Sequence, residues 1–284
     1  MTHPSLRRGA LAVLGVAIAL TGLSCAGGGG GGTVGVIAAA VSKTSSGNTA
    51  RFRMEMTMSG QELGGSLTIP VEGEMDFRDL RARMTMDFPE IPGSPDLGQV
   101  EMVMDGTVFY MRSPAFTQTG GLSTPWIKFD LEELTAGAVD LQTLSSSRTD
   151  PTQALEYLRG MGEVTKVGTE EIDGTATTHY RGIVDLRRAV ENAPESNRDA
   201  LEAAVDQFEE FAGTTTFPED VWIGSDGRVR RMEFAFHLSD PKSGQTFDMG
   251  MRMDLFDFGV DVVVEPPPDD QVTDLSDLAG ASSP

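Results

Sequence analysis

A cysteine thiol is the most reactive side chain in this sequence, and it occurs once, at Cys25. A disulfide needs a second thiol, which the chain does not contain. Cys25 stands where an uncharged apolar segment, residues 10–23, ends and where a run of glycines, residues 27–32, begins. Because glycines offer a thiol no apolar surface to pack against, the position indicates an attachment point.

The residues before Cys25 have the layout of a secretory signal, with Arg7 and Arg8 ahead of the apolar segment. That segment is shorter than the roughly 20 apolar residues that a spanning helix needs. The sequence Gly22-Leu23-Ser24-Cys25 resembles a bacterial lipobox, although the lipobox usually has leucine where Gly22 stands. The resemblance implies a signal peptide over residues 1–24 and acylation of Cys25. The alternative is an ordinary cleaved signal with an incidental thiol.

The sequence contains no pattern typical of a catalytic centre. It has no H-E-x-x-H, C-x-x-C, G-x-S-x-G or P-loop motif. His179 and His237 lie on predicted strands, where we expect each to be solvated or hydrogen-bonded rather than a metal ligand. We therefore predict a protein that is not an enzyme and that has no cofactor or metal.

The formal net charge is -21, which becomes about -23 if cleavage before Cys25 removes Arg7 and Arg8. Such a surface repels phosphates, so it excludes nucleic acid as a partner and excludes binding through anionic lipid headgroups. No acidic cluster has the calcium-loop pattern D-x-[DN]-x-[DN]-G. The acidity is best explained by solubility at a crowded envelope.

Flexible composition occurs at the two ends and not in the middle. Residues 25–33 read as a glycine-rich tether, and residues 265–284, which begin Glu265-Pro266-Pro267-Pro268, read as a disordered acidic and proline-rich tail. No linker interrupts residues 34–264. We therefore expect one domain there.

Strict alternation of apolar and polar residues dominates that domain and predicts half-buried strands. In one example Phe52, Met54, Met56 and Met58 alternate with charged and polar residues. Asp105-Gly106, Asp173-Gly174 and Asp226-Gly227 each lie between two such runs and predict tight hairpin turns. The fold class is therefore α+β, with an antiparallel sheet of about nine to eleven strands.

Capping residues predict four helices. One covers residues 33–43. Another begins at Asp150-Pro151 and extends to Met161, a third follows Ser196 and ends before Gly213, and a short one follows Asp185. Helices of this length cover only about half of the roughly 1,200 Å² of apolar face that ten strands offer. A strongly curved half-barrel with a partial helical lid tends to leave a cavity.

Methionine is not a preferred strand residue, yet every methionine after the initiator except Met161 falls in the strand runs. Two interpretations stay open: a solid methionine-rich core, or a compliant apolar pocket for acyl chains, since methionine adapts to varied partners. The candidate pocket-lining residues are Met54, Met56, Met58, Met84, Met86, Met102, Met104, Phe234, Phe236, Met249 and Met251.

Four stretches resemble the actinobacterial and mycobacterial lipoproteins of the LppX and LprG group. They are Ser45 to Met58, Trp126 to Leu131, Gly168 to Leu186 and Asp220 to Met232. The resemblance implies a LolA-like half-barrel with helices over its concave side and a cavity for lipids or acylated glycolipids. It transfers one functional residue, the lipidated cysteine, onto Cys25. Trp126 and Trp222 line the cavity mouth or fill the core, and we favour the core.

Together these features predict a lipoprotein on the outer face of the cell membrane, held by lipidated Cys25. It would bind acyl chains of a lipid or glycolipid and carry or present them, with an envelope transporter as a possible further partner. The alternative is a solid-cored interaction or sensor lipoprotein that docks a protein partner. Packing of the methionines distinguishes the two.

Overall fold

The computed structural model describes residues 33–60, 65–90, 96–118, 122–130, 164–191, 195–239 and 246–276. Within them twelve strands form one sheet. The strands are β1 (Thr49–Gly60), β2 (Gly65–Asp76), β3 (Arg81–Asp87), β4 (Gln99–Asp105), β5 (Val108–Arg112), β6 (Trp126–Asp130), β7 (Thr165–Ile172), β8 (Thr175–Asp185), β9 (Thr216–Gly224), β10 (Val229–Ser239), β11 (Thr246–Phe256) and β12 (Val272–Asp274).

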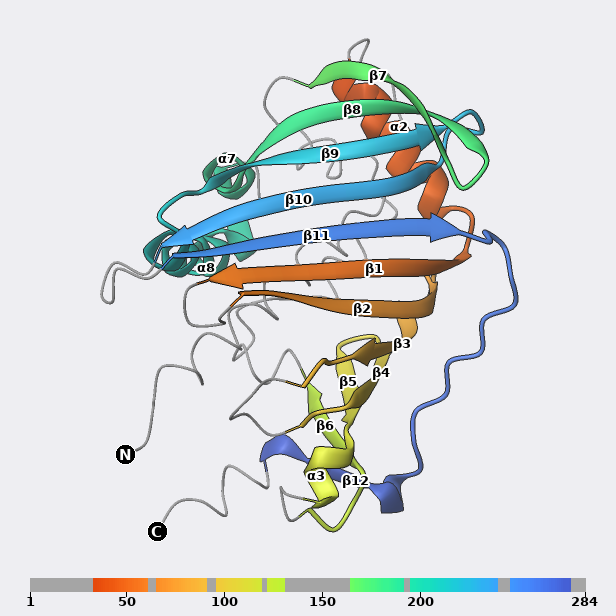
Figure 1. Ribbon diagram of the computed structural model, residues 1–284, viewed down its shortest axis with the longest axis vertical. Helices are drawn as coiled ribbons and strands as arrows, with labels where there is room; N and C mark the ends of the chain where they lie inside the picture. The colour runs from red at the N-terminus through yellow and green to blue at the C-terminus, as the bar shows by residue number, and fades with distance from the viewer. Residues whose placement is uncertain are drawn as a thin grey trace.

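The strand order is β12-β6-β5-β4-β3-β2-β1-β11-β10-β9-β8-β7, and the sheet is open because β12 and β7 stand at its two ends. Every neighbouring pair is antiparallel except β12 with β6, which is parallel. Figure 1 shows the sheet curving along its length. The predicted fold class, a curved antiparallel half-barrel with few helices, is confirmed. The predicted count of nine to eleven strands was too low, because the described residues form twelve, and β12, which comes from the segment expected to be disordered, adds the one parallel pair.

The hairpins predicted from Asp-Gly pairs are present. Asp173 and Gly174 both have positive φ, 46° and 74°, and join β7 to β8. Gly106, at φ 65°, follows β4, and Gly227, at φ 76°, stands between β9 and β10. Glycine tolerates this left-handed backbone region because it has no Cβ.

The helices are α2 (Thr33–Ser45), α3 (Pro114–Gln118), α7 (Leu186–Glu191) and α8 (Glu195–Ala212), with a 3-10 turn η3 at Asp269–Gln271. Three of the four predicted helices are confirmed as α2, α7 and α8. The backbone N–H of Arg188 donates to Asp185 Oδ1 at 3.2 Å, which caps α7, and α8 ends before Gly213 at φ 68°. The helix predicted from Asp150 to Met161 lies outside the described residues.

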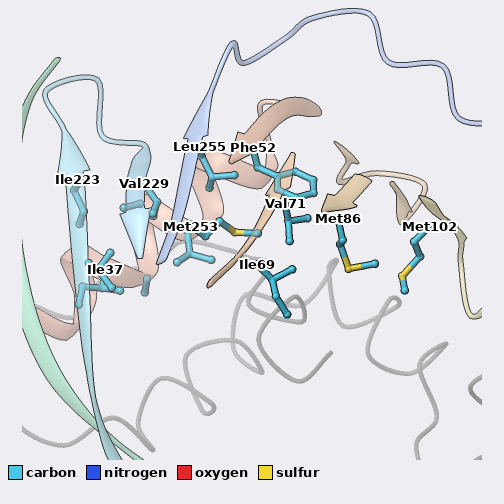
Figure 2. Packing of buried hydrophobic residues seen from close by; sticks show 14 of the residues in the cluster. Ile37, Phe52, Ile69, Val71, Met86, Met102, Ile223, Val229, Met253 and Leu255 are labelled. Carbon is cyan, nitrogen blue, oxygen red and sulfur yellow. The ribbon is translucent and has the colours of Figure 1, made fainter. Parts of the chain in front are cut away.

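One face of the sheet, here called the inner face, carries the apolar member of each alternating pair. Phe52 of β1 lies opposite Leu255 of β11, and Met84 of β3 lies opposite Met102 of β4. Side chains from these strands and Ile37 of α2 form the main core cluster. Figure 2 shows Ile69, Met86 and Met102 projecting from the same side of their strands. Burying such side chains supplies about 1.5–3 kcal/mol each.

The opposite face, here called the outer face, carries charged ladders. Arg252 donates to Glu233 at 2.5 Å across β11 and β10, and Arg81 donates to Asp105 at 2.7 Å across β3 and β4. These side chains are between 31% and 47% exposed, so solvent screens each pair and its contribution to stability is typically about 0–1 kcal/mol. The apolar residues of the alternating sequence therefore lie on the inner face of the sheet, and most of the polar residues lie on the outer face.

Residues 257–276, here called the C-terminal arm, run from β11 past the edges of several strands to β6 (Figure 1). Val264 packs with Val103 and Trp126, two apolar residues of the outer face. Residues 272–274 then pair with β6 as β12. The disorder predicted from Glu265 onward is therefore wrong for residues 265–276, because the arm has an apolar patch to cover and a strand edge to pair with. Residues 277–284, and the tether and signal over residues 1–32, lie outside the described residues.

Candidate functional site

All eleven candidate lining residues lie on the inner face. The ladders place methionine beside methionine: Met54, Met56 and Met58 of β1 lie opposite Met253, Met251 and Met249 of β11. Phe234 and Phe236 of β10 lie opposite Met251 and Met249 on the other side of β11. Met84 lies opposite Met102, and Met86 and Met104 lie in the same ladder of β3 with β4. The structure therefore gathers these residues on one surface.

Their burial divides them into two groups. Met86, Met102, Phe234 and Phe236 are buried, each with an exposed fraction of 9% or less. The remaining seven are half-buried: Met54, Met56, Met58, Met84, Met104, Met249 and Met251. Half-burial on an apolar face leaves flexible thioether side chains with surface still free to contact another apolar group.

The lining residues also belong to two packing clusters. Those of β1, β3 and β4 pack with the main core cluster around Phe52 and Val71. Those of β10 and β11 pack with a second cluster of Phe217, Phe234, Phe236 and Ala212, here called the aromatic cluster. Alternation along a strand cannot show this division, because it reports a face and not the neighbours on that face.

Rings in the aromatic cluster meet in tilted and edge-on arrangements. Phe217 and Phe236 have ring centroids 4.5 Å apart, and Phe234 and Phe236 have centroids 5.2 Å apart. Phe208 of α8 meets Phe236 edge-on at 5.7 Å. This geometry is the one that aromatic quadrupoles favour. Helix α8 is thereby fixed over one end of the inner face.

Glu219 of β9 lies on this same face, and the sequence analysis did not select it. It is 3% exposed, and its ladder neighbours are Phe234 of β10 and Gly182 of β8. Burial raises the pKa of Glu219 to about 7, with a smaller contribution from the charge of Asp220. The alternation Phe217, Glu219, Val221, Ile223 is the sequence signal that places its side chain inward.

The predicted strand histidines lie on the outer face. His179 stacks on Trp222 with ring centroids 4.1 Å apart, and its Nε2 lies 2.5 Å from Asp220 Oδ1. His237 Nδ1 lies 2.7 Å from Asp248 Oδ1 at an exposed site. The expectation that both are hydrogen-bonded strand residues is confirmed.

Both tryptophans are buried, at 5% for Trp126 and 6% for Trp222, but neither lies on the inner face. Trp222 donates from Nε1 to Glu170 Oε1 at 2.5 Å, next to His179. Trp126 packs beneath the C-terminal arm with Val264. The favoured assignment to the core is therefore confirmed, and the two tryptophans pack in two separate buried clusters on the outer side of the sheet. An apolar residue on the outer face must also be shielded from water by other residues. The alternation of the sequence does not show which residues shield it.

Within the ranges that the structure describes, no three histidine, cysteine, aspartate or glutamate side chains gather as metal ligands do. A search of the same residues found no helix with the length and apolarity to span a bilayer. Cys25 lies outside them, so its acylation stays a prediction. What the described part of the chain offers is an apolar, methionine-rich face with one buried carboxyl.

Comparison with known proteins finds a relative by sequence. The chain is 31% identical over 167 residues to an uncharacterized 31.2 kDa protein from the rplA–rplJ intergenic region of Streptomyces griseus. The match covers 56% of this chain and 50% of the relative, so it spans half the length of that protein. No family model matches the sequence.

Solved structures that match this chain include the Mycobacterium tuberculosis lipoprotein LppX, at 16% identity and a TM-score of 0.49 over 82% of this chain and 97% of LppX. LprF from Mycobacterium bovis has 14% identity and a TM-score of 0.38, over 82% of this chain and 96% of LprF. The resemblance to the LppX group that the sequence predicted is thus found again among solved structures. The likeness says nothing about what this chain binds.

Proposed function

We propose that this chain is an extracytoplasmic lipoprotein that binds the acyl chains of a lipid or acylated glycolipid against its inner face and carries or presents them. The observation that carries the proposal is the row of half-buried methionines on adjacent strands, from Met104 on β4 to Met249 on β11. Acyl chains bound there would be removed from water, and the gain is roughly 25 cal/mol per Å² of apolar surface buried.

Methionine suits this task better than a branched residue does. Its side chain is unbranched, with three rotatable bonds and a polarisable sulfur, so it adapts to chains of different length and saturation. A core selected for rigidity would favour leucine, isoleucine and valine, whose rotamers are better defined. The methionine ladders of β1 with β11 and of β3 with β4 therefore support a compliant binding surface.

Acylation of Cys25 would hold the protein at the membrane where its ligand resides. Two or more chains give stable attachment, because each buried methylene contributes about 0.8 kcal/mol. Glycines 27–32 separate Cys25 from α2, which begins at Thr33, and would give the domain freedom to turn its inner face toward lipid. The formal charge, -21 for the full sequence and about -23 after cleavage before Cys25, disfavours direct adsorption to anionic headgroups, so contact with the membrane would depend on the anchor.

One observation favours the second candidate, a solid-cored module that docks a protein partner. Phe52 and Val71, at the end of the inner face near α2, are each 1% exposed, as a close-packed core requires. Under this alternative the methionines fill irregular gaps, and no lipid binds.

The decisive experiment is mass spectrometry of lipids that co-purify with the full-length chain, in the native form extracted from membranes and in a Cys25→Ala variant. We expect stoichiometric acyl lipid on both, since the inner face and not the anchor holds it. Absence of lipid from both preparations, with no uptake when the delipidated protein meets total lipid extract, would favour the docking module.

A matched pair of variants locates the binding surface. Met56 and Thr57 are neighbours on β1, but Met56 faces inward and Thr57 faces outward. We expect Met56→Gln to lower lipid occupancy several-fold, because it places an amide among acyl chains, and Thr57→Gln to leave occupancy unchanged. Equal occupancy in the two variants would place bound lipid elsewhere on the molecule.

A further inference from the structure

Glu219 is a buried carboxyl on the inner face that the proposed acyl-chain binding does not use. We propose that Glu219 is the point of polar recognition on the inner face, where its carboxyl hydrogen-bonds a hydroxyl group carried within the apolar part of the lipid. The inference rests on the proposed function, and it narrows the ligand to a hydroxylated acyl lipid.

The first support is the isolation of this carboxyl. Along β1 to β6 and β8 to β11, the ladders assign every inward position a nonionic side chain or tyrosine except position 219. The other acids and bases that these ladders pair, such as Asp220 and Arg181, lie at outward positions, and Arg230 falls in the bulge of β10, where the ladder assigns it to neither face. Solubility explains acidic residues on the exposed face of a sheet. It does not explain a single buried acid on the hydrophobic face.

The second support is the neighbourhood of the carboxyl. On one side, β8 presents Gly182, which has no side chain to cover or pair with Glu219. On the other side, β10 presents Phe234, and along β9 the next inward residues are Phe217 and Val221. Each of these side chains is apolar, so none of them satisfies a carboxyl.

The third support is the cost of leaving Glu219 without a partner. Its side chain makes no hydrogen bond or ion pair with any residue in the described part of the chain, and the residue is 3% exposed. His179 and Arg181, on the outer face, hydrogen-bond Asp220, the next residue along β9, and not Glu219. Burying a polar group without a compensating hydrogen bond costs about 1–3 kcal/mol on the mutational scale, and a ligand group that supplies the bond removes this cost.

The chemistry of the partner follows from the surroundings. A cationic group would require the carboxyl to stay ionised, which burial among phenylalanines and valines opposes. A hydroxyl both donates and accepts, so it pairs with the ionised carboxylate as donor and with the protonated acid in either role. A group with a pKa near 7 exists in both forms, and the hydroxyl is the neutral lipid group that suits both.

The test compares two probes that differ in one hydroxyl, methyl 12-hydroxystearate and methyl stearate, by isothermal titration of the delipidated full-length protein. We expect the wild type to bind the hydroxylated ester about tenfold more tightly, Glu219→Leu to bind both esters equally, and Glu219→Gln to retain part of the preference, because an amide also donates and accepts. Glu72→Gln, an outward change on β2, serves as the matched control and should keep the full preference.

Circular dichroism and thermal midpoints of each variant establish that it is folded before binding is compared. Equal affinity of wild type for the two esters, or a preference that survives Glu219→Leu, would overturn the inference and leave acyl binding intact. Failure of wild type to bind either ester would overturn this inference together with the proposed function. The two failures are therefore distinguishable.

Discussion

Phe52 lies directly over Gly73, its partner in the ladder of β1 with β2. A Cβ on Gly73 would fall 2.5 Å from Cζ of Phe52 and 2.5 Å from the backbone carbonyl oxygen of Arg83. Phe52 is 1% exposed, so its ring has little room to withdraw. The ring of Phe52 on β1 thus occupies the space that a side chain at position 73 of β2 would need, and this close approach sets the packing at the α2 end of the inner face.

Gly73→Ala should therefore destabilise the fold by about 1–3 kcal/mol, the usual cost of overpacking. Gly65 is the matched control, because it also lies inward on β2 and a Cβ there would meet nothing within 4 Å. Urea denaturation followed by circular dichroism measures both. Similar midpoints for the two variants would show that Phe52 can move aside.

The hydroxyl of Thr44, at the end of α2, joins the helix to the sheet. It accepts from the backbone N–H of Val229 at 2.8 Å and donates to the carbonyl of Ala40 at 2.7 Å, and Thr44 is 5% exposed. Thr44→Val keeps the shape but leaves a buried N–H without its acceptor, which should cost about 1–3 kcal/mol. Ser46→Ala removes an exposed hydroxyl of the same helix end and should change stability by less than about 0.5 kcal/mol. A neutral Thr44→Val variant would contradict the role of this contact.

The raised pKa of Glu219 predicts a pH dependence of stability. Its pKa is about 7 when folded and 4.5 in the reference state, so the folded protein binds more protons between these values. The contribution is fully present below pH 4.5 and is lost as pH rises through 7, and the total change is roughly 3 kcal/mol. Glu219→Gln should remove this component, seen as the difference between wild-type and variant unfolding free energies from pH 4.5 to 8. A constant difference across that range would mean that the folded pKa is not raised.

The ion pair of Arg231 with Asp254 should contribute more to the free energy of unfolding than the exposed ion pair of Arg51 with Asp257 does. Arg231 Nε and Nη2 donate to the two carboxylate oxygens at 2.5 and 2.8 Å, and the side chains are only 21% and 12% exposed. The hydrogen bond to Asp254 also raises the pKa of Arg231. A double-mutant cycle with Arg231→Met and Asp254→Asn should give a coupling energy of about 1–3 kcal/mol.

The control cycle uses Arg51 and Asp257, which meet at 3.2 Å with both side chains about half exposed. Solvent screens that pair, so its coupling energy should be about 0–1 kcal/mol. Equal coupling in the two cycles would show that the bidentate geometry and burial of Arg231 add nothing.

The packing of the C-terminal arm against the sheet should depend on Val264 and not on Val263. Within the arm, Val264 faces the sheet and is 8% exposed, whereas Val263 is 67% exposed. Val264→Asp places a charge against Trp126 and should release the arm, so that amides of β6 and β12 exchange faster with deuterium. Val263→Asp should leave exchange unchanged. Unaltered exchange in both would show that strand pairing alone holds the arm.

Local chemistry made much of this fold predictable. Alternation at positions 52, 54, 56 and 58 assigns a face because successive side chains of a strand point in opposite directions. Asp173-Gly174 specifies a hairpin through its own backbone preferences, and Gly213 ends α8 for the same reason. The eleven candidate lining residues lie on one face because, within each strand, they are spaced two residues apart.

The C-terminal arm and the tryptophans were not predictable in this way. Pro266, Pro267 and Pro268 suggested disorder, but order over residues 265–276 depends on Trp126, Val103 and the free edge of β6, all more than 130 residues earlier in the chain. Trp222 of β9 likewise stacks on His179 of β8, a contact between residues that are far apart in the sequence. Such contacts depend on strand order, which alternation does not encode.

By itself the sequence determined the alternating strands, the hairpin turns, three helices and the expectation of an anchor at Cys25, because each depends on residues close together in the chain. Only the tertiary structure decided that Glu219 is buried between Phe234 and Gly182 without a partner among the described residues, and that the arm covers Trp126. The physical reason is that burial and pairing are set by neighbours distant in the chain, which the strand order of the sheet brings together.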